Sequence, residues 1–182
     1  GLRSMPWVGR SSGRRYWLSS NVVRNIAAAS VIAMFEETLA AVIALAFFLP
    51  IISDMSGCSG NQSVAVSVRE LSLGLVKPRE VSYVWLKEIG IGIINGAVLG
   101  SLLGIVAWLW QGNGYLGVVV GLALAANTMI AVSIGGAVPL LLKRFNMDPA
   151  LASGPILTTV TDICGFALVL GIATAMLPLL IG

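Results

Sequence analysis

Asp162 is a single carboxylate near the middle of a long apolar stretch, residues 150–181. An ionised carboxylate at the centre of a bilayer costs at least about 3 kcal/mol, so it normally faces a protein interior or water and marks an ion or proton pathway. Three of the four preceding residues are threonines, and Gly165 follows. This pattern predicts a cation site in a membrane pore.

Helical spacing would place several oxygen atoms beside this carboxylate. Thr158 and Thr159 precede Asp162 by four and three residues, so their hydroxyls share its face of a helix, and Gly154 and Gly165 leave room there. Mg²⁺ prefers oxygen ligands and gives up water reluctantly, so one or two carboxylates suit it. The chain has no histidine, which argues against a dedicated zinc or copper site. The alternative is a structural aspartate that is hydrogen-bonded to neighbouring helices.

The composition is that of an integral membrane protein. Of 182 residues, 57% are hydrophobic and 10% are charged, whereas a soluble domain carries about 25% charge. This length allows roughly four to six helical spans. The net charge of +3 gives no indication of a nucleic-acid partner, because basic residues in such a protein mainly report orientation. Cys58 and Cys164 form no zinc or disulfide pattern, and we expect them to be packing residues.

The apolar segments predict an all-α protein with five transmembrane helices, at residues 16–35, 38–75, 89–110, 116–142 and 150–181. Residues 1–15 would be a cytoplasmic N-terminal segment, and residues 16–182 the ion-conducting domain. With five spans, all 11 basic residues fall on one side, which predicts a cytoplasmic N-terminus and an extracytoplasmic C-terminus in the cell (inner) membrane. In the third span, glycines recur at every fourth position and predict close helix contact: Gly92, Gly96, Gly100 and Gly104.

The second span is too long for one straight crossing. Residues 38–75 would extend over about 55 Å as a helix, against roughly 30 Å of hydrocarbon. Pro50 and the polar run 54–63, which contains two glycines, predict a broken helix that lines a cavity. Asp54 would be either a pore ligand or the cap of a half-helix. Asn61 would orient a hydrated ion or satisfy loosened backbone.

The other acidic residues allow more ordinary interpretations. Asp148 before Pro149 is typical of a helix start, with aspartate as N-cap and proline at the first helical position, and this does not exclude metal contact. Glu36 and Glu37 lie at a predicted outer turn, as solvated residues or as a vestibule that attracts cations. We expect surface charge pairs with neighbouring basic residues for Glu70, Glu80 and Glu88.

Six motifs follow one another along the chain: Phe35-Glu36-Glu37, Ala46-Phe47-Phe48-Leu49-Pro50, Gly57-Cys58-Ser59-Gly60-Asn61-Gln62-Ser63, Leu86-Lys87-Glu88, Asp148-Pro149-Ala150 through Pro155, and Thr158-Thr159-Val160-Thr161-Asp162. In their order and spacing they resemble the transmembrane domain of the MgtE magnesium channel/transporter family. The resemblance covers residue 16 to the C-terminus, nearly the whole chain.

The resemblance implies a homodimer of five-helix protomers, with the ion path at the dimer axis and lined by the second and fifth spans. It further implies that Asp162 binds the permeating Mg²⁺ and that the backbone at Thr158 contributes. Gly57 and Asn61 would form the adjacent constriction. Asp148 would face the cytoplasm and take part in metal-dependent gating.

The chain departs from the family pattern in two places. The family usually has a glycine, and then a Gly-Gly-Asn run, where this chain has Asp54 and Ser56-Gly57-Cys58. Asp54 can therefore add a second carboxylate to the pore. Full-length relatives also carry cytoplasmic regulatory domains ahead of the first span, where this chain has only residues 1–15, so we do not predict metal sensing by such domains.

We therefore predict a non-enzymatic, homodimeric transporter in the lipid bilayer that moves divalent cations, most simply Mg²⁺ influx down its gradient. Mn²⁺, Co²⁺ and Ca²⁺ remain open as substrates. A proton- or sodium-coupled carrier or exporter is the main alternative, because broken helices and a buried carboxylate serve carriers equally. A scaffold without transport is a further one. An intramembrane aspartyl protease with Asp54 and Asp162 is disfavoured, because the Gly-x-Gly-Asp motif of such enzymes is absent.

Overall fold

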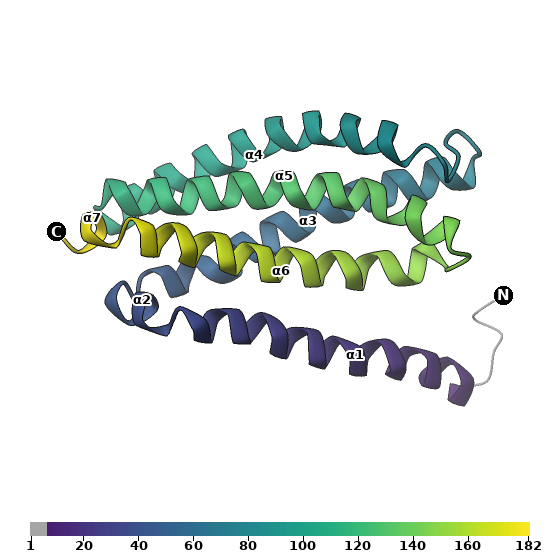
Figure 1. Cartoon of the computed structure of the whole chain (residues 1–182), viewed down its shortest axis with the longest axis horizontal. Helices are drawn as coiled ribbons and strands as arrows, with labels where there is room; N and C mark the ends of the chain where they lie inside the picture. The colour runs from purple at the N-terminus through teal and green to yellow at the C-terminus, as the bar shows by residue number, and fades with distance from the viewer. Residues whose placement is uncertain (1–6) are drawn as a thin grey trace.

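The computed structural model describes residues 7–182 and consists of helices throughout this range, without strands. The predicted N-terminal segment 1–15 therefore lies partly outside the described residues, and its remainder begins the first helix. Figure 1 shows the long helices running side by side in alternating directions. The helices are α1 (Trp7–Met34), α2 (Glu36–Ala41), α3 (Leu45–Ser72), α4 (Val81–Gln111), α5 (Gly114–Arg144), α6 (Pro149–Ala175) and α7 (Leu177–Ile181).

Three of these helices, α4, α5 and α6, are long and apolar enough to cross a membrane, by length and composition. They correspond to the third, fourth and fifth predicted spans. In α1 the apolar part is shorter, Leu18–Met34, and α3 carries many polar side chains. The all-helical class is thus confirmed, and the count of five spans stays a prediction.

Helix α5 is the centre of the bundle and packs against α3, α4 and α6, whereas α1 contacts mainly α6. The largest apolar cluster joins α3, α4, α5 and α6 and includes the fully buried side chains of Phe48, Ile52, Leu124 and Leu170. Helix α5 is therefore covered by α3, α4 and α6. The polar residues of α3 and α6 lie on helices that pack against it.

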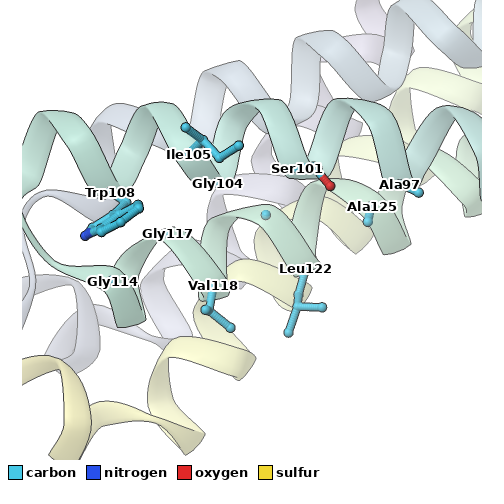
Figure 2. A pocket seen from close by; sticks show the side chains of 12 residues that line it. Ala97, Ser101, Gly104, Ile105, Trp108, Gly114, Gly117, Val118, Leu122 and Ala125 are labelled. Carbon is cyan, nitrogen blue, oxygen red and sulfur yellow. The ribbon is translucent and has the colours of Figure 1, made fainter.

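The predicted glycine contact along the third span is confirmed, with α5 as the partner. A Cβ added at Gly96 would lie 2.5 Å from the carbonyl oxygen of Ala125, and one added at Gly100 would lie 2.5 Å from that of Gly121. The two backbones are thus too close for any side chain between them. Figure 2 shows one side of this contact, an apolar groove in which Gly104 and Gly117 lie between Trp108 and Leu122.

The predicted break within residues 54–63 is wrong, because α3 continues without interruption from Leu45 to Ser72. The chain is interrupted earlier, at residues 42–44, between α2 and α3. Pro50 lies in the second turn of α3, where it removes one backbone hydrogen bond and its ring is compatible with helical φ. Asp54 therefore lies inside a continuous helix, and its alternative role as the cap of a half-helix is also wrong.

Packing explains the glycine and serine content that suggested a break. A Cβ added at Gly60 would lie 2.9 Å from the Ala131 carbonyl oxygen and 2.7 Å from Leu157, so glycine lets α3 approach α5 and α6. On the same buried side, the hydroxyl of Ser67 donates to the carbonyl oxygen of Gly136 at 2.8 Å. These small and polar residues join helices and do not unwind one.

The fifth predicted span is also shorter than expected. Helix α6 ends at Ala175, and the short helix α7 follows after Met176, with Pro178 in its first turn. The side chain of Asn113 caps α5 and also donates to the carbonyl oxygen of Leu180 at 3.3 Å. This bond ties α7 to the turn between α4 and α5.

Candidate cation site

Asp162 lies near the middle of the 27-residue helix α6. The helix begins as the sequence predicts: Asp148 accepts a hydrogen bond from the backbone N–H of Ala150 at 2.9 Å, and Pro149 occupies the first helical turn. Helix α6 continues without interruption from Pro149 past Asp162, with Pro155 accommodated inside it. The cap and the uninterrupted helix therefore set how deep the carboxylate lies in the bundle.

The Asp162 side chain faces α3, where the hydroxyl of Ser53 donates a hydrogen bond to its Oδ1. Asp162 is only partly buried, and its Oδ2 makes no hydrogen bond to the groups that the structure describes. A serine is a neutral donor and leaves the negative charge in place. Asp162 is thus hydrogen-bonded to a neighbouring helix, as expected for a structural aspartate. It also retains an oxygen that can face a cation.

The two threonines that share the face of Asp162 bond to their own helix. Thr158 donates to the carbonyl oxygen of Gly154 at 3.0 Å, and Thr159 donates to that of Pro155 at 2.9 Å. Such back-bonding uses the hydroxyl hydrogen, so each oxygen still has lone pairs to offer. Thr158 is exposed, so its oxygen is accessible from outside the protomer.

The α3 residues of the candidate site lie along one side of that helix. Asp54 and Asn61 are exposed, and Gly57 is partly buried. A Cβ added at Gly57 would lie 3.9 Å from the Thr161 hydroxyl, so Gly57 lies at the contact between α3 and α6. The helix spacing of three, four and seven residues places Asp54, Gly57 and Asn61 on one face.

The structure thus brings Asp162, Thr158 and Gly57 together where α3 meets α6, with Asp54 and Asn61 further along the α3 face. Asp148 is separate, because it lies about 20 Å from Asp162 along the axis of α6. Within the described range, no three acidic, histidine or cysteine side chains converge on one point. The oxygen atoms of one chain therefore form an open face, not an enclosed site.

Comparison with known proteins assigns this arrangement to a family. The family model named MgtE, divalent cation transporter, matches residues 49–172, which include nearly all of α3, all of α4 and α5, and most of α6. The chain belongs to the MgtE family. The match covers every candidate site residue.

Three proteins named magnesium transporter MgtE are similar to this chain. The one from Bacillus subtilis is 38% identical over 161 residues, which is 88% of this chain. Those from Thermus thermophilus and Enterococcus faecalis are 35% and 34% identical over 88% and 90% of it. The chain spans only 36% of the length of each of these relatives.

Family membership confirms the resemblance to the MgtE family and fits a multi-pass membrane protein. The matching family model describes a transporter, which is consistent with the prediction of a non-enzyme. Metal binding by Asp162, Thr158, Asp54, Gly57, Asn61 or Asp148 stays a prediction.

Glu88 corrects one expectation for this MgtE-family chain. We expected it at the surface in a charge pair, but only 8% of it is exposed. Its Oε2 accepts a hydrogen bond from the Ser63 hydroxyl at 2.7 Å. A Cβ added at Gly136 would lie 2.5 Å from the Cγ of Glu88, so the glycine of α5 makes space for this side chain. Glu88 lies two turns inside α4, where helix packing and not solvent surrounds it.

Two residues near the site were not predicted from the sequence. Ser53 contacts Asp162, and Asn127 contacts the preceding residue, Thr161. Asn127 is fully buried in α5, and its Nδ2 donates to the carbonyl oxygen of Thr161 at 3.1 Å. An amide side chain inside the apolar segment 116–142 was the available signal, because polar groups at such positions need a partner. For Ser53 the sequence offers no distinguishing signal among the serines of α3.

Proposed function

We propose that the chain is the ion-conducting part of an MgtE-type transporter that moves Mg²⁺ across the cell membrane. Helices α1, α3, α4, α5 and α6 would be its five spans. The α3–α4 and α5–α6 connections lie at the same end of the bundle as the start of α1 (Figure 1). That end carries Arg69, Lys143 and Arg144, which supports a cytoplasmic position for it.

One observation carries the proposal: polar side chains are exposed at mid-helix, on the side where α3 and α6 meet. Asp54, Asn61 and Thr158 are exposed, and Asp162 is partly exposed. A lipid environment does not solvate such groups, so polar residues at membrane depth face protein or a water-filled path. The single protomer leaves this face open, which supports a path completed by a second copy.

A homodimer with two-fold symmetry would place two Asp162 carboxylates on either side of the path. Their two negative charges match one divalent cation. Mg²⁺ holds its water tightly and is commonly bound through one or two carboxylates, so we propose that the ion passes largely hydrated. An inside-negative membrane potential of 100 mV would favour entry by about 4.6 kcal/mol, since each charge contributes about 2.3 kcal/mol.

The other candidate residues would then have distinct roles. Gly57 and Asn61 would form the constriction beside Asp162, because glycine leaves space and the amide can hydrogen-bond to water on the ion. Asp54 would add a second carboxylate to the path. Asp148 would contact metal at the cytoplasmic end of α6, in addition to its capping bond.

The proposal is tested by Mg²⁺ uptake into proteoliposomes, with wild-type protein and Asp162→Asn. The substitution keeps the shape of the side chain and removes its charge. Loss of a group that only orients a metal ligand already costs about 10–100-fold, so we expect uptake to fall by at least about tenfold when the ligand itself loses its charge. Elution as one monodisperse species would show that the variant folds. Undiminished uptake by Asp162→Asn would contradict the proposal.

The same vesicles separate a passive pathway from an ion-coupled carrier. We expect the reversal potential to follow the Mg²⁺ gradient alone. A reversal potential that also shifts with an imposed pH or Na⁺ gradient would establish coupled transport instead.

A further inference from the structure

Asn127 is a buried amide of α5 that reaches the backbone of α6 beside the candidate cation ligand. It has no exposed surface, and its Nδ2 donates to the carbonyl oxygen of Thr161 at 3.1 Å. Thr161 directly precedes Asp162, so the bonded carbonyl belongs to the peptide group that leads into the ligand residue. The amide thus acts on the backbone next to Asp162, and not on its carboxylate.

The space for this amide is provided by Gly165, one turn after Thr161. A Cβ added at Gly165 would lie 2.7 Å from Nδ2 of Asn127 and 3.7 Å from Cγ2 of Ile52 in α3. Gly165 itself is buried. Any larger residue at position 165 would therefore push the amide away from the Thr161 carbonyl. Three helices meet at this point, and the glycine allows them to do so.

Asp162 is consequently held from two directions. Ser53 of α3 bonds its side chain directly, and Asn127 of α5 bonds the adjoining peptide group. Thr161 is fully buried, and its hydroxyl donates to the carbonyl oxygen of Thr158 at 3.0 Å, one turn earlier. These bonds limit both the rotation of α6 and its movement along its axis at the level of the carboxylate.

Stability alone does not account for an asparagine here. Its Oδ1 is buried without a hydrogen-bond partner, and an unpaired buried carbonyl oxygen is unfavourable. An apolar side chain of similar size would fill the same space without that penalty. What the apolar side chain would lack is the N–H donor to Thr161.

We propose that Asn127 is a positioning residue for the cation site, which holds the Thr161–Asp162 segment of α6 in the register that aims Asp162 at the ion path. The inference rests on the proposed function. Groups that orient a ligand without touching the metal commonly change its affinity by about 10–100-fold when they are removed. We therefore assign to Asn127 an effect on half-saturation and ion selectivity, beyond any effect on folding.

The test compares Asn127→Leu with a matched control, Thr128→Val. Thr128 is the next residue of α5, is equally buried, and has a hydroxyl without a partner, so both variants replace a buried polar side chain by an apolar one. Each is assayed in proteoliposomes for Mg²⁺ uptake against concentration and for competition by Ca²⁺. We expect Asn127→Leu to raise the half-saturating Mg²⁺ concentration by about tenfold and to weaken discrimination against Ca²⁺. Thr128→Val should match the wild type in both.

A second variant reaches the same bond from the opposite helix. Gly165→Ala leaves Asn127 in place and displaces its amide, so it should reproduce the shift in half-saturation. Combined with Asn127→Ala, it should add no further shift, because both changes remove one interaction and their effects are then not additive. This variant also keeps the test open if Asn127→Leu does not fold.

The outcomes separate the two proposals. Wild-type half-saturation and selectivity in folded Asn127→Leu, with only the yield or maximal flux reduced, would overturn the positioning role and leave the transport function intact. Additive effects of Gly165→Ala and Asn127→Ala would overturn it as well. Absence of Mg²⁺ uptake by the wild type would overturn both.

Discussion

At the scale of single residues, the candidate site depends on which oxygen atoms remain accessible. Asp162 bonds Ser53 through Oδ1 and stays partly exposed, while Thr158 offers a hydroxyl oxygen whose hydrogen is already used. Asp54 follows Ser53 in α3 and is exposed. Asp162, which the family resemblance identifies as the ion ligand, is thus held by a hydrogen bond, whereas the side chain of Asp54 is exposed.

The contribution of Asp54 is tested by Asp54→Asn. We expect a rise of about fivefold in the half-saturating Mg²⁺ concentration, because loss of one charge near a hydrated ion removes a Coulomb attraction of about 1 kcal/mol. Uptake assays in proteoliposomes, at several Mg²⁺ concentrations, measure this.

Asparagine is the better replacement than glycine, since glycine inside the continuous helix α3 would also cost about 1 kcal/mol of helix stability. Half-saturation and Ca²⁺ competition equal to those of the wild type would show that Asp54 lies outside the ion path.

At the scale of helices, close backbone contact holds α4 and α3 against α5. The contacts of Gly96 with Ala125 and of Gly60 with Gly135 and Ala131 bring main-chain atoms together. Polar bonds add to this, because Ser63 and Glu88 join α3 to α4, and Ser67 joins α3 to α5. The helix that carries Asp54 and Asn61 is therefore fixed on its inner side and polar on its outer side.

The glycine contact between α4 and α5 predicts a contrast between two substitutions in the same helix. Gly96→Ala should destabilise the protein by about 1–3 kcal/mol, because its Cβ would meet backbone atoms that cannot turn aside. Gly90→Ala should be neutral or stabilise by up to about 1 kcal/mol, since nothing lies within 4 Å of its added Cβ and alanine favours the helix.

Thermal unfolding of both variants in the same detergent gives the comparison. Equal melting temperatures for Gly96→Ala and Gly90→Ala would show that α4 and α5 are not in backbone contact.

At the scale of the whole molecule, the outer surface of α4 contrasts with the α3–α6 side of the protomer. Many large apolar side chains of α4 are exposed, among them Ile94, Leu102 and Leu109, as expected for helices that face lipid. The α3–α6 side differs, because it exposes Asp54, Asn61 and Thr158. A two-fold partner on that side would enclose the polar groups between two copies and leave the apolar surface for lipid.

Cross-linking tests where the second copy binds. In a background in which Cys58 and Cys164 are replaced by serine, Thr158→Cys should yield covalent dimers with a short bis-maleimide in membranes. Ile94→Cys, at a position that is 66% exposed on α4, should stay monomeric under the same conditions. Dimers from Ile94→Cys and none from Thr158→Cys would place the partner on the opposite side and reject the proposed path.

Local sequence patterns were sufficient for several features. The glycine spacing in α4 predicted a close contact, because four-residue repeats lie on one helix face whatever the partner is. Asp148-Pro149 predicted the start of α6, since capping depends on adjacent residues only. The apolar segments of α4, α5 and α6 were visible because membrane-length hydrophobicity is a property of the chain itself.

Only the tertiary structure decided the course of α3 and the neighbours of Asp162. Proline, glycine and serine in one segment fit either an unwound helix or a tightly packed one, and the contacts of Gly60 and Ser63 with other helices select the second. Helix packing likewise buries Glu88, which the sequence alone placed at the surface. Ser53 and Asn127 reach the Asp162 region from helices far away in sequence, and a hydrogen bond between such residues follows from how the helices pack, which no local pattern specifies.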